Sequence, residues 1–201
     1  MSASATIIDA GGANLASVRY ALERLGVEVR IARDADELAG SERIVLPGVG
    51  AARPAMRQMR ERGLDTALRV STVPLLGICL GMQLLFEDSE EGEVSCLGLL
   101  PGRVMRLRGS DEARTPHMGW NTLEALRPDP ALAGVAAEAQ AYFVHGFAAP
   151  VTADCVAACS HGVRFAAVVR RQGVLGTQFH PERSGALGAR VLRNFIEGAA
   201  A

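Results

Sequence analysis

The sequence predicts a single α/β domain, in which helices flank a mostly parallel sheet and a smaller antiparallel β appendage follows. Across residues 5–86, short apolar runs typical of strands alternate with helical patterns, the order that produces a parallel sheet. Across residues 102–179, short β-like runs follow one another with turn residues between them. No repeat, low-complexity segment or long linker divides the 201 residues, so we expect one domain over residues 1–201.

The first half contains four expected strands and four expected helices. The first helix has the clearest pattern, because its leucine and valine residues from Leu15 to Leu25 recur at spacings of three and four. Asn14 stands before this pattern as the expected N-cap. The expected strands cover residues 5–10, 27–32, 43–46 and 74–78, and the other helices cover residues 54–62, 64–70 and 80–86.

The second half predicts short strands and a C-terminal helix. That helix, over residues 183–198, places Val191, Phe195 and Ile196 on one face. Residues 116–121, Pro-His-Met-Gly-Trp-Asn, are interpreted as a turn, with a partner-binding surface as the alternative. The β-like runs cover residues 102–107, 141–148, 155–158, 165–170 and 174–179.

Composition and charge exclude several classes of protein. Apolar residues make up 49% of the chain and the net charge is −1, so no bulk attraction to nucleic acid or anionic membranes is expected. The longest uncharged stretch, residues 70–86, contains Pro74 and polar positions and does not predict a membrane span. Four sparse cysteines without a preceding secretory signal predict a reducing cytoplasm. Cys155 and Cys159 would lie about 13 Å apart on a strand, too far to share a metal ion, and no metal or cofactor is expected.

The strongest chemical signal is the pentapeptide Gly77-Ile78-Cys79-Leu80-Gly81, between an expected strand and an expected helix. A sharp strand-to-helix turn exposes a nucleophile at the end of a sheet, and it requires small residues two positions before and after. The helix N-terminus would lower the thiol pKa and direct N–H groups, including that of Leu80, at a reacting carbonyl. The motif predicts Cys79 as a nucleophile, with a buried structural cysteine as the alternative.

A second signal, Gln178-Phe179-His180-Pro181-Glu182, follows the last β-like run. A cysteine nucleophile needs an imidazole to move protons, and the imidazole needs an orienting acceptor. Positions two apart in an extended segment point to the same side, so His180 and Glu182 are candidate neighbours. A solvated turn is the alternative.

A third signal, Pro47-Gly48-Val49-Gly50, follows the third expected strand. Its glycines allow backbone N–H groups to approach a ligand, as in an oxyanion hole. A plain tight turn is the alternative.

Together these motifs resemble the class I (triad) glutamine amidotransferases, and most closely the glutaminase subunits of imidazole glycerol phosphate synthase. The run from Cys79 to Gln83 distinguishes these subunits from the anthranilate and aminobenzoate relatives, which usually carry His where Met82 stands. Residues 116–121 are also characteristic of these subunits. The resemblance extends over nearly the whole chain and includes residues 47–50, 54–56, 84–87, 89–92, 142–145, 178–184 and 194–195.

The resemblance implies a flavodoxin-like fold and a role for each matching residue. Cys79 would be the nucleophile, His180 the acid and base, and Glu182 the orienting carboxylate. The chain departs from the family at residues 10–13 and after His145, where Ser-Tyr or a similar pair is common, so backbone contacts alone would bind glutamine there. The remaining implied roles are the oxyanion hole for Val49, Gly50 and Leu80, glutamine binding for Gln83, Gly146 and Phe147, and the partner interface for Asn14, Trp120 and Arg183.

The resemblance also implies a heterodimer with a (β/α)-barrel cyclase. This partner would receive ammonia from L-glutamine through a tunnel and make imidazole glycerol phosphate and aminoimidazole carboxamide ribonucleotide, in L-histidine biosynthesis. Two other classes stay open from the residues alone. One is a glutaminase of another synthase, of the anthranilate or aminobenzoate type, and the other is a non-catalytic flavodoxin-like module.

Overall fold

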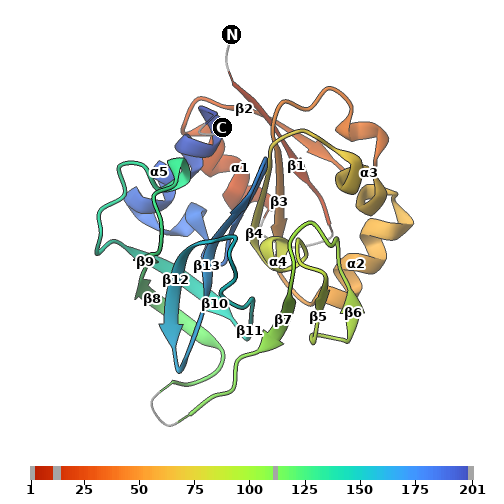
Figure 1. Cartoon of the computed structure of the whole chain (residues 1–201). Coiled ribbons are helices and arrows are strands. Elements are labelled where there is room, and N and C mark those ends of the chain that lie inside the picture. Colours follow the sequence, from red (N-terminus) through yellow and green to blue (C-terminus); the bar gives the residue numbers. More distant parts are fainter. Residues whose placement is uncertain (1–2, 11–14, 111–112, 199–201) are drawn as a thin grey trace.

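The computed structural model describes residues 3–10, 15–110 and 113–198, and an eight-stranded sheet runs through their centre (Figure 1). From β2 to β14 the neighbouring strands are parallel, and from β14 to β9 they are antiparallel. The predicted α/β class with a mostly parallel sheet is confirmed. In spatial order the strands are β2 (Glu28–Ala32), β1 (Ser4–Ile8), β3 (Ile44–Gly48), β4 (Leu75–Cys79), β14 (Val174–Thr177), β13 (Val163–Arg171), β12 (Cys155–His161) and β9 (Glu124–Ala125).

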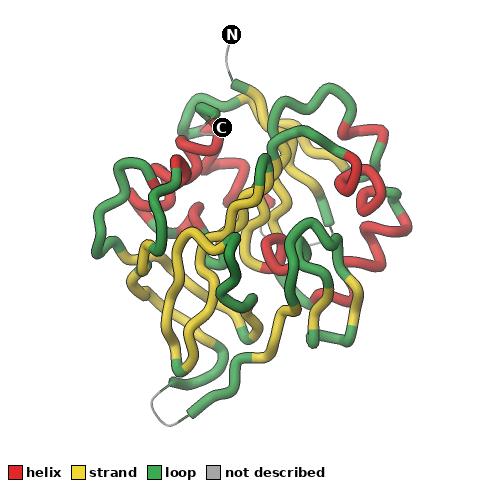
Figure 2. Tube along the Cα trace, in the orientation of Figure 1, coloured by secondary structure: helices red, strands yellow, loops and turns green. Residues whose placement is uncertain are grey.

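Helices cover both faces of the parallel part (Figure 2), which explains why its central strands β3 and β4 are apolar without alternation. Ile7 and Ile8 are neighbours in β1 and are both fully buried, yet they belong to separate core clusters. One core cluster includes residues of α1 (Leu15–Glu23) and α5 (Gly185–Ile196), and the other includes residues of α2 (Ala52–Glu61), α3 (Leu64–Val70) and α4 (Leu80–Gln83).

Within the described ranges no helix combines the length and apolar character needed to cross a bilayer.

The second half builds two smaller sheets beside the main one. An antiparallel pair joins β8 (His117–Thr122) to β10 (Gln140–His145). A four-stranded sheet has the order β11 (Phe147–Ala148), β7 (Arg103–Arg106), β5 (Asp88–Ser89) and β6 (Val94–Ser95). Three short 3₁₀ helices complete the fold, namely η1 (Asp36–Leu38), η2 (Pro130–Leu132) and η3 (Pro181–Arg183).

Several expected boundaries are wrong. Residues 116–121 are not a turn, because β8 takes its hydrogen bonds from β10, a strand distant in sequence. The single strand expected at residues 141–148 divides at Gly146 into β10 and β11, which belong to different sheets. The helix expected over residues 80–86 ends at Gln83, since Leu85 donates to the carbonyl of Met82 in a tighter turn. The C-terminal helix begins at Gly185, two residues later than expected.

Candidate active site

Cys79 lies at the sharp turn between β4 and α4, as predicted. Its φ of 55° and ψ of −111° are unusual for a residue with a side chain, and such strain concentrates at functional sites. A Cβ atom on Gly77 would lie 2.7 Å from the carbonyl oxygen of Gly81, and one on Gly81 would collide with the carbonyl of Leu46. Glycine at these positions therefore lets α4 approach β3 and β4 closely enough to present Cys79.

His180 follows β14, the parallel neighbour of β4, so the two strand ends bring it beside Cys79. The backbone N–H of His180 donates to the carbonyl of Tyr142, and its carbonyl accepts from the hydroxyl of Ser184. A Cβ atom on Gly188 of α5 would collide with the carbonyl of Pro181, so the helix packs directly on this turn. These contacts fix the position of the His180 ring.

Glu182 accepts a hydrogen bond from Nδ1 of His180 at 2.8 Å, and both side chains are buried. The two residues are neighbours, as predicted, although the reason differs. His180 is extended, but Glu182 lies in η3, so a 3₁₀ turn and not a continuing strand brings the carboxylate to the imidazole.

The pKa of His180 reflects opposing effects. Burial alone would lower it, but hydrogen bonds with Cys79 and Glu182, and the charges of both groups, raise it to about 10. The imidazole therefore retains its proton at neutral pH. A protonated ring between the Cys79 sulfur and a carboxylate can donate a proton to a leaving group.

A pocket of about 260 Å³ opens on Cys79 and His180. Gln83 borders it, and its amide nitrogen donates to the Phe147 carbonyl at 2.7 Å and to Oε1 of Gln178 at 2.9 Å. Gln83 therefore ties α4 to the segment after β10. The structure places every predicted oxyanion and glutamine-binding residue at this pocket, whose lining comprises Val49, Gly50, Cys79, Leu80, Gln83, Glu91, Val144, His145, Gly146, Phe147 and His180.

Glu91 is a pocket residue to which the sequence assigned no role. Its Oε2 accepts a 2.8 Å hydrogen bond from the backbone N–H of Ala52, at the N-terminus of α2, where negative charge is favoured. Burial raises its pKa, whereas the Ala52 hydrogen bond and the charge of Arg106 oppose that rise. The run Ser-Glu-Glu-Gly at residues 89–92 was the available signal, but only the fold shows that Glu91 reaches the pocket.

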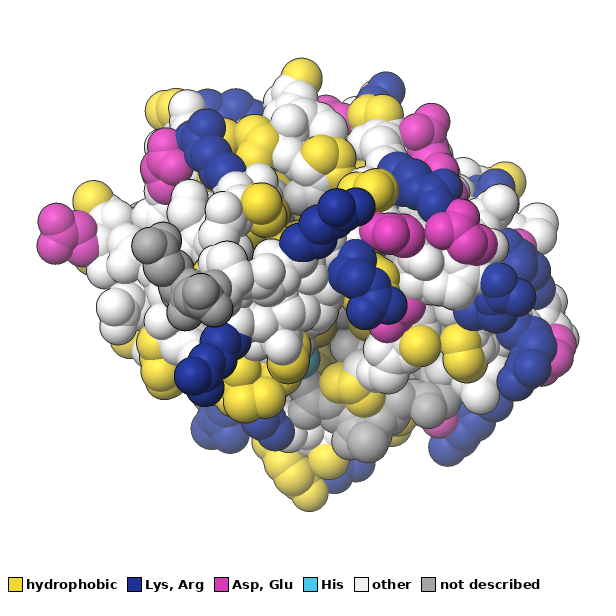
Figure 3. Space-filling view, turned by 90° about the horizontal axis from the view of Figure 1, so that it is seen from below, with side chains coloured by type: hydrophobic (Ala, Val, Ile, Leu, Met, Phe, Trp, Pro, Cys, Tyr) yellow, Lys and Arg dark blue, Asp and Glu magenta, His cyan; other side chains and the backbone are white. Residues whose placement is uncertain are grey.

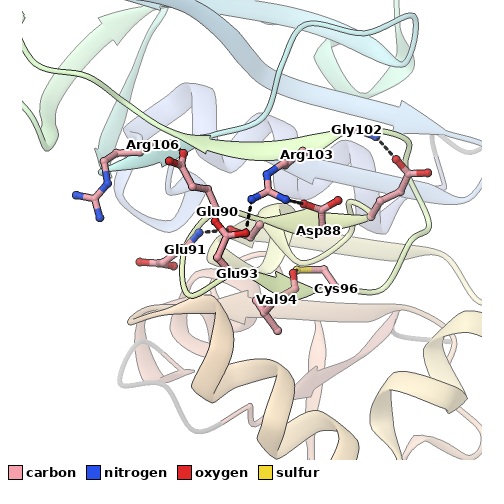
Figure 4. A network of polar contacts seen from close by, with 11 residues as sticks. Asp88, Glu90, Glu91, Glu93, Val94, Cys96, Gly102, Arg103 and Arg106 are labelled. Atoms are coloured by element: carbon pink, nitrogen blue, oxygen red, sulfur yellow. Dashed lines mark hydrogen bonds and ion pairs between the residues drawn. The ribbon is translucent and has the colours of Figure 1, made fainter.

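A network of charged residues holds the segment that carries Glu91 (Figure 4). Arg103 of β7 pairs with Asp88 at 2.7 Å and with Glu93 at 2.6 Å, on either side of Glu91. The carboxylate of Glu90 accepts from the backbone N–H of Arg106 at 2.7 Å. These bonds between β7 and the segment 88–93 position the Glu91 side chain at the N-terminus of α2.

The other three cysteines differ from Cys79 in their surroundings. Burial raises the pKa of Cys96 and of Cys155 to about 11, and that of Cys159 to about 12. Such thiols are unreactive at neutral pH. Among the residues that the structure describes, no cluster of three metal-ligating side chains occurs, and all four cysteines are free.

The predicted interface residues are exposed where they are described. Trp120 is 53% exposed, and its ring meets that of Tyr142 edge to face at 5.9 Å across the β8–β10 pair. Met118 on the same strand is 64% exposed. Arg183 ends η3 at the surface, and Asn14 lies outside the described residues. Figure 3 shows the molecule from below, where arginine side chains are spread over the surface and a small patch of histidine is visible beside hydrophobic side chains.

Comparison with known proteins defines the class first. The family model for class I glutamine amidotransferases matches residues 6–199, and the chain belongs to this family. Two solved structures share the fold with a TM-score of 0.75. One is a glutamine amidotransferase, at 23% identity, with 96% of this chain and 98% of that chain covered. The other is a putative GMP synthase protein from Thermoplasma acidophilum, at 21% identity, with 99% of this chain and 94% of that chain covered.

Curated relatives define the particular group. "Imidazole glycerol phosphate synthase subunit HisH" of Xanthomonas euvesicatoria pv. vesicatoria (strain 85-10) is 62% identical over 191 residues, which cover 95% of this chain and 96% of that protein. The protein of the same name from Xylella fastidiosa (strain Temecula1) is 60% identical with the same coverage. The chain is therefore a glutamine amidotransferase of the HisH group, and the resemblance seen in the sequence is confirmed.

Proposed function

We propose that this chain hydrolyses L-glutamine through Cys79, His180 and Glu182 and delivers the ammonia to a (β/α)-barrel cyclase subunit. The observation that carries the proposal is the continuous hydrogen-bonded series from Glu182 through His180 to Cys79 at the edge of a pocket. A nucleophile, a proton carrier and its orienting carboxylate are the parts that acyl transfer requires.

The reaction begins when the Cys79 thiolate attacks the carbon of the glutamine side-chain amide. The protonated ring of His180 donates its proton to the departing nitrogen, so ammonia leaves and a γ-glutamyl thioester remains. His180 is then neutral, and it accepts a proton from the water that attacks the thioester. Glutamate leaves, and the thiolate and the imidazolium are restored.

Backbone N–H groups stabilise the oxyanion in both steps. Leu80 is the first residue of α4, and the first N–H groups of a helix have no partner within it. Val49 and Gly50 line the same pocket, and Gly50 has a φ of 101°, which favours glycine. Donors fixed in this way before the reaction stabilise charge without reorganisation.

The same pocket offers a carboxylate and a stretch of backbone to the α-ammonium and α-carboxylate groups of glutamine. Glu91 is the carboxylate that lines it, and we assign it to the substrate α-ammonium group. The backbone of Gly146 and Phe147 forms another part of the wall, and we assign it to the α-carboxylate. Gln83 supports this wall through its bond to the Phe147 carbonyl.

The relatives are named as subunits of imidazole glycerol phosphate synthase, which supports a heterodimer with a cyclase. Ammonia released into water at neutral pH would be protonated and lost as a nucleophile, so we propose that a tunnel in the cyclase receives it directly. The complex would make imidazole glycerol phosphate and aminoimidazole carboxamide ribonucleotide in the cytoplasm. Four free cysteines fit that reducing compartment.

The proposed function is tested by measuring glutamate release from L-glutamine by this chain alone, with its genomic cyclase, and with a chorismate-using synthase component. We expect the cyclase and its nucleotide substrate to stimulate hydrolysis, and nucleotide product to form in step with glutamate. Stimulation by the chorismate-using component in place of the cyclase would establish the other glutaminase class. Absence of glutamate release under all three conditions would refute the glutaminase assignment.

The exposed residues Arg183 and Trp120 predict the docking surface. We expect Arg183→Ala and Trp120→Ala to weaken cyclase binding and to lower the stimulation of glutamine hydrolysis, because an interfacial charge or aromatic anchor would be lost. Truncating one side of a buried charge pair costs about 2–5 kcal/mol, and a pair at the rim costs far less. Arg193→Ala, an exposed arginine in the last turn of α5, is the matched control. Unchanged affinity and turnover in both variants would show that this face is not the interface.

A further inference from the structure

Two buried histidines outside the proposed catalytic series lie directly opposite each other on β8 and β10. His117 and His145 are paired in the register of these strands, and Nδ1 of His117 lies 3.0 Å from Nε2 of His145. The other ring nitrogen of His145, Nδ1, lies 2.8 Å from the carbonyl oxygen of Phe147. The exposed fractions of His117 and His145 are 3% and 6%.

One assignment of ring protons satisfies this series of contacts. A carbonyl oxygen only accepts, so Nδ1 of His145 carries a hydrogen and donates to Phe147. Nε2 of neutral His145 then accepts from Nδ1 of His117, and Nε2 of His117 accepts from the amide nitrogen of Asn121 at 3.3 Å. Burial lowers the pKa of His117 to about 4 and that of His145 to about 3, so both rings are neutral at neutral pH, as the series requires.

The series ends on the wall of the glutamine pocket. The Phe147 carbonyl accepts from both His145 and Gln83, so two side chains from different elements fix one peptide group. The amide nitrogen of Gln83 also donates to Oε1 of Gln178, and the amide nitrogen of Gln178 lies 3.8 Å from Sγ of Cys79. Residues 144–147, which carry His145, all line the pocket.

The rings are also held by stacking. His117 lies between the rings of His161, at 4.1 Å, and Phe143, at 4.8 Å. Three neighbouring histidines suggest a metal site, but the nitrogens of His117 and His145 already bond one another and their neighbours, and Nε2 of His161 donates to the carbonyl of Arg114. The geometry fits a fixed support and not a ligand set.

We propose that His117 and His145 are positioning residues of the glutamine site, which fix the Phe147 peptide and with it the wall that binds the substrate α-carboxylate. The inference rests on the proposed glutaminase function. Neither ring contacts the reacting atoms of the substrate in this scheme. His145 acts through the peptide that it bonds, and His117 acts by fixing the tautomer and orientation of His145.

Two substitutions of His145 separate this role from simple packing. The side-chain nitrogen of asparagine falls near the place of Nδ1, so His145→Asn retains a donor for the Phe147 carbonyl. Glutamine places its amide near Nε2, so His145→Gln loses that donor. We expect His145→Gln to raise the KM for glutamine about tenfold in the complex with the cyclase, with a much smaller change in kcat, and His145→Asn to stay near the wild type.

His117→Phe provides a second test that keeps the stacking and removes both hydrogen bonds of His117. We expect a KM between those of the wild type and His145→Gln. The rate at which iodoacetamide labels Cys79 reports whether the sharp turn between β4 and α4 is intact, and it does not depend on the part of the pocket that binds the α-carboxylate. This rate should be unchanged in all three variants.

Each outcome decides the inference. Equal KM increases in His145→Asn and His145→Gln would show that the ring acts by packing alone, and unchanged KM in His145→Gln and His117→Phe would show that the series does not support the wall. Either result, with normal turnover by the wild type, would overturn this inference and leave the glutaminase function intact. A wild-type complex that releases no glutamate would refute both.

Discussion

Cys79→Ala will abolish glutamine-dependent product formation by the complex, while product formation from added ammonia will continue. The variant removes the sulfur that forms the thioester, and no other nucleophile lies on the elbow between β4 and α4. The cyclase chemistry belongs to the partner, so external ammonia bypasses the lost step. The measurement is the rate of nucleotide product formation with glutamine and with ammonium salt at a pH that supplies free ammonia.

Selective alkylation provides the control for this prediction. A glutamine analogue with an electrophilic carbon should label Cys79 alone, because Cys96, Cys155 and Cys159 are buried and burial raises their pKa. Cys96→Ala is the matched variant and should retain glutamine-dependent turnover. Mass spectrometry that found the label mainly on another cysteine, or residual glutamine-dependent turnover in Cys79→Ala, would contradict the assignment of the nucleophile.

The parallel half of the fold could be predicted because its information is local. Ile7 and Ile8 are consecutive apolar residues, and a run buried on both sides is what a central parallel strand requires. The sharp turn at Cys79 could also be predicted, because the two glycines that it requires, Gly77 and Gly81, lie within two residues of Cys79. The α/β class with a parallel sheet therefore followed from residues that specify their own neighbourhood, whereas the flavodoxin-like fold and the family were implied by the resemblance that these motifs carry.

The part of the site that the sequence did not predict depends on contacts between distant segments. β8 was expected to be a turn, because its pairing with β10 is set by residues that lie 18 to 28 positions later in the chain. Glu91 reaches the pocket because the Asp88–Glu93 segment folds back under Arg103. The bond from His145 to Phe147 forms where one predicted strand divides between two sheets. No local pattern of apolar residues encodes these approaches.

His180 has the second large expected effect. His180→Ala removes the group that protonates the departing nitrogen and activates water, so glutamine-dependent turnover should fall by about 10²–10⁴-fold. Glu182→Gln retains a hydrogen-bond acceptor for Nδ1 of His180 and should cause a smaller loss. Glu197→Gln, the loss of an exposed carboxylate just after α5, is the matched control and should leave turnover unchanged.

The pH dependence of kcat/KM for glutamine distinguishes the role of Glu182 from simple packing. The pKa of His180 is raised to about 10 with contributions from the hydrogen bond and charge of Glu182, so the wild-type ring loses its proton only in strongly alkaline solution. Removing the carboxylate charge removes one of the effects that raise this pKa, and the alkaline fall in kcat/KM should therefore begin at lower pH in Glu182→Gln. Two results would show that the carboxylate does not act through the charge state of His180. One is an alkaline fall in kcat/KM at the same pH in Glu182→Gln as in the wild type. The other is a loss of turnover in Glu182→Gln as large as that in His180→Ala, while iodoacetamide still labels Cys79 normally in both variants.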